Sequence, residues 1–153
     1  MTYFPMFIAT LSLLTSVYNG YLNNRFVDII ENNVARVEYM RTCKEIIEAF
    51  FIVKTRTAAL AERASLDRRT PSGGSVAPAE RFAAVEATAR VGALGTYLAN
   101  LRDEAVRERY TQLTWALEKA VAAASTTEPA SVAKLFEGAD LLFGGLNADC
   151  VKS

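Results

Sequence analysis

Few side chains in this sequence could do chemistry. Cys43 and Cys150 are the two thiols of the 153-residue chain, which contains no histidine. Histidine is the usual general base, the commonest metal ligand and the partner that activates many serine and cysteine nucleophiles. Two cysteines are also too few for a disulfide framework or a four-cysteine zinc site. Histidine-assisted catalysis and the common zinc sites are therefore excluded.

The two cysteines stand in different sequence settings. Cys43 falls on the apolar side of a helical pattern, which predicts a buried structural thiol. Cys150 lies near the C-terminus, where we expect an exposed and reactive thiol. They are far apart in the sequence, and nothing in the pattern requires them to pair. Tyr39 and Trp115 are most simply interpreted as core or rim aromatic residues.

The remaining patterns give no catalytic or binding motif. Carboxylates mostly stand one helical turn from a basic residue, as in Arg41–Glu45 and Lys44–Glu48, which is typical of a solvated helix face. P-loop, GxGxxG, HExxH and CxxC motifs are absent from the sequence. A formal net charge of zero argues against general nucleic-acid binding. We therefore predict no catalytic, cofactor-binding or metal-binding residues, and a protein that is not an enzyme.

Composition and the placement of helix breakers indicate an all-α chain. The eight glycines and four prolines cluster, and long runs without either residue lie between the clusters. A hydrophobic content of 51% is too high for a disordered chain. We predict an N-terminal transmembrane helix, then a long amphipathic helix and a small antiparallel bundle of about four helices. Frequent alanine, with 12 Arg against 5 Lys, suggests a bacterial source.

The first 24 residues carry no charged side chain, and residues 4–22 are mostly apolar. A helix from Tyr3 to Leu22 would be about 30 Å long, enough to span a bilayer core. Aromatic residues stand at both ends of it, as in interfacial belts: Tyr3, Phe4, Tyr18 and Tyr21. We predict a transmembrane anchor over residues 1–24.

Two other interpretations of this segment stay open. A cleaved signal peptide needs basic residues at its start and a small-residue cleavage site, and neither precedes Arg25. An apolar helix buried by partner subunits is the second alternative. It is suggested by the four residues that make the segment only moderately hydrophobic: Ser12, Thr15, Ser16 and Asn19.

Charge next to the segment predicts its orientation. Arg25, Arg36 and Arg41 follow it and no basic residue precedes it, although Asp28 and Glu31 lie among the arginines. The positive-inside rule then places the C-terminal body in the cytoplasm. We expect a single-pass protein of the bacterial inner membrane. Its expected partners are the lipid bilayer and either other membrane-protein subunits or further copies of itself.

Two sets of residues are candidates for helix–helix contact. Ser12, Ser16 and Gly20 recur every four residues, so they share one helix face and would allow another helix to approach closely. Chance is the alternative explanation for so short a motif. The second set alternates by four and three, as in a coiled-coil seam: Phe26, Ile30, Asn33, Val37 and Met40. We predict that this seam contacts a partner and that Asn33 helps to define its register.

The seam belongs to a long amphipathic helix predicted over residues 25–66, which contains neither proline nor glycine. A helix of this length, roughly 60 Å, exceeds what a short bundle covers. We expect its first half to form a stalk that pairs with another chain. The alternative is a longer bundle that covers this face within the same chain.

A flexible loop is predicted over residues 67–78, which hold two prolines and a Gly-Gly pair. Residues 79–153 are predicted to form a helical hairpin and a C-terminal helix that pack on the long helix. Asp103 is a candidate N-cap between two of these helices. Gly92 and Gly95 suggest close packing against a neighbour. We expect the last helix to start at Pro129 and to end at Gly144-Gly145.

The function expected from these features is structural. We predict a non-enzymatic single-pass membrane protein that acts as an accessory, scaffold or assembly subunit of a membrane complex through its helical bundle. The alternative is a ligand-binding or signal-relaying sensor module, which rests on fold-level analogy.

Overall fold

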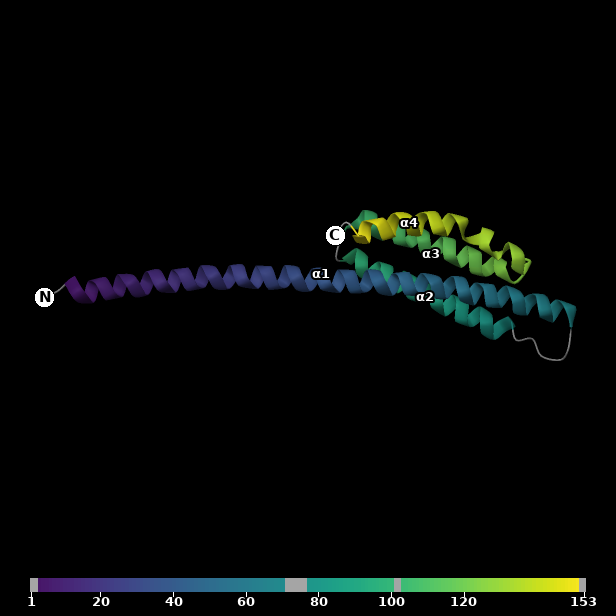
Figure 1. The fold of residues 1–153 in the computed structure, drawn as a ribbon, viewed down its shortest axis with the longest axis horizontal. Coiled ribbons are helices and arrows are strands. Elements are labelled where there is room, and N and C mark those ends of the chain that lie inside the picture. The colour runs from purple at the N-terminus through teal and green to yellow at the C-terminus, as the bar shows by residue number, and fades with distance from the viewer. Residues whose placement is uncertain (1–2, 71–76, 101–102, 152–153) are drawn as a thin grey trace. The chain divides into compact units, whose positions relative to one another are not determined.

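A computed structural model describes residues 3–70, 77–100 and 103–151. Its elements are α1 (Tyr3–Arg69), α2 (Ala77–Asn100), α3 (Glu104–Ala124), the 3₁₀ helix η1 (Pro129–Phe136) and α4 (Glu137–Val151), as Figure 1 shows. These described residues contain no strand. The predicted all-α fold and the helical bundle are therefore confirmed.

The chain divides into two units, Met1–Glu38 and Tyr39–Ser153. We call the described part of the first unit, residues 3–38, the N-terminal segment, and the second unit the body. Residues 6–37 of the N-terminal segment are all exposed. The hydrophobic core lies in the body, and residues of α1 from Tyr39 onward contribute to it.

The predicted transmembrane anchor over residues 1–24 is not supported. No helix among the described residues has a stretch that is both long and apolar enough to cross a membrane. Four polar side chains lower the mean hydropathy of this stretch, and they are the weak points of the prediction: Ser12, Thr15, Ser16 and Asn19. The predicted fold class is therefore corrected in one respect: the structure does not support its N-terminal transmembrane helix.

Helices α1 and α4 run antiparallel and contact each other at three places along their length. Phe50, which is 1% exposed, stacks on Phe143 with ring centroids 3.9 Å apart. One turn further along α1, the Lys54 ammonium group pairs with Asp140 at 2.8 Å and lies 5.7 Å from the centre of the Phe50 ring. Burial of the phenyl rings contributes more than the half-exposed ion pair, which is worth about 1 kcal/mol or less.

A disulfide between Cys43 and Cys150 links the same two helices. Both residues are buried, so the expectation of an exposed thiol at Cys150 was wrong. The error came from ending the last helix at Gly144-Gly145. In the structure α4 continues through both glycines to Val151, which turns Cys150 into the core beside α1. Position 43 is buried as predicted, but as half of a cystine and not as a free thiol.

Helices α2 and α3 approach each other most closely near the ends that the short connection joins. A Cβ added at Gly95 would lie 2.8 Å from Cβ of Tyr110, and one at Gly92 would lie 3.2 Å from Cγ2 of Thr114. Real Cβ atoms do not occupy the first position without displacing their neighbour. The close packing expected for these two glycines is therefore present.

The helix cap and the helix ends observed in the structure agree in part with those predicted from the sequence. Asp103 is the N-cap of α3, and its carboxylate accepts a hydrogen bond from the Val106 N–H at 2.9 Å. Pro129 starts a helix as expected, but its first eight residues are 3₁₀ and α4 begins only at Glu137. Helix α1 extends to Arg69 and α2 starts at Ala77, so both reach into the loop predicted over 67–78. Residues 71–76 lie outside the described residues.

Replacing Gly95 by alanine should destabilise the body. The added methyl group meets the Cβ of Tyr110, which cannot move without shifting α3, so we expect a loss of about 1–3 kcal/mol in the free energy of unfolding. Gly144→Ala is the matched control, because an added Cβ there has no atom within 4 Å. It should be neutral or stabilise α4 by up to about 1 kcal/mol. Urea denaturation of both variants measures the difference, and equal losses would contradict the close contact.

Reducing the disulfide should lower the stability of the body. It bridges residues separated by 107 positions, and removing such a link typically costs about 2–5 kcal/mol. We expect the midpoint of urea denaturation to fall when a reductant is added to the wild-type chain. The Cys43→Ala/Cys150→Ala variant should start at the lower midpoint and not respond to the reductant. A wild-type midpoint that is insensitive to reductant would show that the two cysteines are not bonded.

Candidate functional site

Residues 25–37 of the N-terminal segment form an amphipathic helix with an apolar and a polar face. Successive residues of an α-helix are rotated by about 100° around its axis, so the apolar residues here occupy a sector about 160° wide. We call this sector the apolar stripe. Its apolar members are 42–68% exposed: Phe26, Val27, Ile29, Ile30, Val34 and Val37. The charged and polar residues lie on the opposite side: Arg25, Asp28, Glu31, Asn32 and Arg36. A stripe of this kind is normally buried against other helices.

The five residues predicted to contact a partner are all exposed. Phe26, Ile30, Asn33 and Val37 belong to the N-terminal segment, and Met40 belongs to the body. Asn33 lies within the apolar stripe and is its one polar member.

The second predicted set, Ser12, Ser16 and Gly20, is also exposed. A Cβ added at Gly20 would meet no atom within 4 Å. Both serines line a shallow hollow on the helix, together with four other residues: Ile8, Leu11, Thr15 and Asn19. The Thr15 hydroxyl donates to the Leu11 carbonyl at 2.8 Å, so that donor is already satisfied inside the helix. The structure brings these small residues to one face and shows nothing packed on them.

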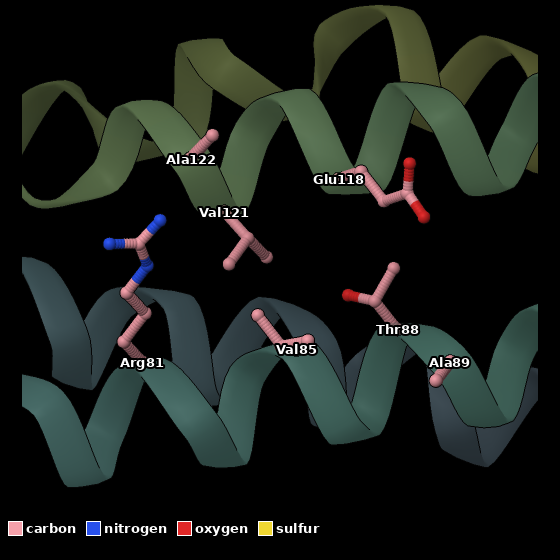
Figure 2. A pocket seen from close by; sticks show the side chains of 7 residues that line it. All are labelled: Arg81, Val85, Thr88, Ala89, Glu118, Val121 and Ala122. Atoms are coloured by element: carbon pink, nitrogen blue, oxygen red, sulfur yellow. The ribbon is translucent and has the colours of Figure 1, made fainter.

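A groove between α2 and α3 in the body was not found from the sequence (Figure 2). Its volume is about 130 Å³, and it is lined by Arg81, Val85, Thr88 and Ala89 of α2 and by Glu118, Val121 and Ala122 of α3. Figure 2 shows the Arg81 guanidinium and the Glu118 carboxylate toward opposite ends, with the two valines between them. The signal that could have located it is the small size of Ala89 and Ala122, combined with the glycines that bring α2 and α3 together further along.

Polar residues near the disulfide form the most perturbed electrostatic environment of the body. Tyr110 is 3% exposed, and its pKa is raised to about 12, first by burial and then by the nearby Tyr39. Asp149 adds to this rise, whereas Arg109, which pairs with Asp149 at 2.5 Å, opposes it. Tyr110 is therefore protonated at neutral pH and does not supply a base. Over the described residues, no group of three or more His, Cys, Asp or Glu could hold a metal ion.

Comparisons with protein-family models, with curated proteins and with solved structures found no match to this chain. The interpretation of the site therefore rests on its own geometry.

Burial of Tyr110 predicts a loss of stability at high pH. Between its ordinary pKa of 10.0 and the folded value of about 12, the native state holds a proton that the unfolded state releases. The free energy of unfolding should therefore fall as pH rises through that window, by about 2–3 kcal/mol. Tyr110→Phe keeps the ring and removes the titrating group. Urea denaturation from about pH 8 to about pH 12 should show a smaller decline for the variant, and parallel declines would contradict the assignment.

Proposed function

We propose that this chain is a non-enzymatic accessory, scaffold or assembly subunit that joins a larger complex through its N-terminal segment. The observation that carries the proposal is the exposed apolar stripe on residues 26–37. Six large apolar side chains stand in solvent on one face, while the body has its own core. Contiguous apolar surface of this kind marks sites of protein–protein or membrane contact.

The free energy available from covering the stripe is large. Fully burying one Val, Ile or Phe side chain is worth about 1.5–3 kcal/mol, so six half-exposed side chains offer roughly 5–10 kcal/mol. Association costs at least about 4 kcal/mol in lost translation and rotation. Burial of the stripe can therefore drive binding. The net free energy of binding is more favourable when a partner also buries residues 6–22.

Helices of partner subunits are the cover that fits residues 6–22 best. Asn19 and the small residues Ser12 and Ser16 share one face of the helix. Small residues allow another backbone to approach, and amide and hydroxyl groups can hydrogen-bond across such a contact. The alternative is that a lipid bilayer buries the apolar side of the same residues.

The disulfide bears on where the body resides. Disulfides persist in oxidising compartments and are rare in the reducing cytosol. The Cys43–Cys150 bond therefore favours a body outside the cytosol, the opposite of the orientation expected from the flanking arginines. We propose an oxidising compartment for the body because the flanking charges are mixed in sign, whereas the bond is buried within the core.

A ligand-binding module is the second candidate function, and the α2–α3 groove favours it. Opposite charges at the two ends of an apolar floor would suit a small molecule that carries both a cationic and an anionic group. Trp115, the one tryptophan in the sequence, lies one helical turn before Glu118 and is 63% exposed. Its fluorescence provides a direct probe of binding in the groove.

Purification of the tagged full-length chain in mild detergent tests the two candidates. We expect partner subunits at fixed stoichiometry, and we expect Val34→Asp to lose them because it places a charge in the apolar stripe. Ala35→Asp adds the same charge on the polar face and should keep them. A chain that purifies alone as a monomer, with zwitterionic small molecules changing its Trp115 fluorescence, would instead favour the ligand-binding module. Carbonate washing of the membrane fraction shows whether lipid or the helices of other proteins bury residues 6–22.

A further inference from the structure

We propose that the partner of the apolar stripe is the same stripe on other copies of this chain, packed parallel and in register in a bundle of three or more helices. The inference rests on the proposed function, because it names the partner that covers the N-terminal segment. The order of residues around the helix, the width of the stripe and the position of Asn33 support this arrangement.

The residues follow a heptad repeat in which Ile30 and Val37 take position a, and Phe26 and Asn33 take position d. The flanking e and g positions are also apolar over most of the segment: Val27, Ile29 and Val34. Charged residues occupy b, c and f positions: Arg25, Asp28, Glu31 and Glu38. Arg36, at a g position, is the exception, and its long side chain can extend from the edge of a seam to water.

The width of the stripe sets the number of neighbours. A two-stranded coiled coil buries the narrow seam of a and d positions and leaves e and g at its edge. In this chain the apolar surface also includes e and g, so one neighbour would leave Val27, Ile29 and Val34 partly in water. A helix that contacts two neighbours buries both flanks. Three or more helices therefore fit the stripe better than two.

Asn33 identifies the partner as another copy of the chain. Its carboxamide both donates and accepts, so it needs a polar partner once it is covered. Burying it against an unrelated apolar helix would leave these groups unpaired, which is unfavourable. A parallel, in-register copy places Asn33 opposite another Asn33, and the two amides can hydrogen-bond to each other. An antiparallel copy would place Ile30 or Val37 there instead.

Cysteine cross-linking of the full chain in mild detergent tests this arrangement. Asn33→Cys should form a covalent dimer under mild oxidation, because symmetry places the substituted positions of adjacent copies together. Asn32→Cys is the matched control, since the neighbouring asparagine lies on the polar face and should cross-link several-fold less. Peptide mapping confirms that the Cys43–Cys150 bond is intact in both variants.

Sedimentation analysis of the full chain gives the second measurement. We expect a trimer or larger assembly for the wild type, and Ile30→Asp should weaken self-association by about tenfold or more because it buries a charge. Ala35→Asp should sediment like the wild type. Circular dichroism and the urea midpoint verify that the body of each variant folds, as expected for substitutions at exposed positions.

Three outcomes would overturn the inference: a monomeric wild type, a stable dimer, or equal cross-linking of Asn32→Cys and Asn33→Cys. If the wild type is monomeric but Val34→Asp still loses its co-purifying subunits, the stripe binds other proteins and the proposed function survives. If no subunit co-purifies and the chain is also monomeric, both proposals fail.

Discussion

The body depends on one long-range contact, the packing of α4 against α1. Sequence neighbours cannot supply it, because the two helices lie at opposite ends of the chain. The stacked pair Phe50 and Phe143 provides its apolar centre, and the Cys43–Cys150 bond lies about two turns away along both helices. With α4 attached in this way, the hairpin of α2 and α3 is enclosed in the same core. Helix α4 also contacts α3, so it connects α1 with the α2–α3 hairpin.

Helices α2 and α3 form both a close contact and a groove. Gly92 and Gly95 give the backbone room where the helices meet, and Tyr110 fills the space that a side chain at 95 would need. Further from the connection, Val85 and Val121 are not bulky enough to close the gap, and the groove results. The pair of glycines accounts for the tightly packed contact. The hollow is a consequence of how the two helices pack, whatever its use.

Patterns confined to one helix were predictable from the sequence. The long α1 helix, the Asp103 cap and the apolar stripe each depend on residues within a few turns of each other, so periodicity and capping rules suffice. The disulfide and the groove were not predictable, because they depend on which helices become neighbours. Gly144-Gly145 was misleading since glycine is only weakly unfavourable inside a helix, and attachment of α4 to α1 overrides that preference. The transmembrane prediction depended on a marginal hydropathy, which four polar residues reduce.

The placement of the cystine also affects how the protein responds to proteolysis. The bond between residues 43 and 150 encloses almost the whole body in one covalent ring. A single cut anywhere inside that ring leaves both fragments joined, so the body can be nicked without falling apart. The apolar stripe on residues 26–37 lies outside the ring. A single cut between the stripe and Cys43 would therefore release the exposed helix and leave the body with all of its covalent ring.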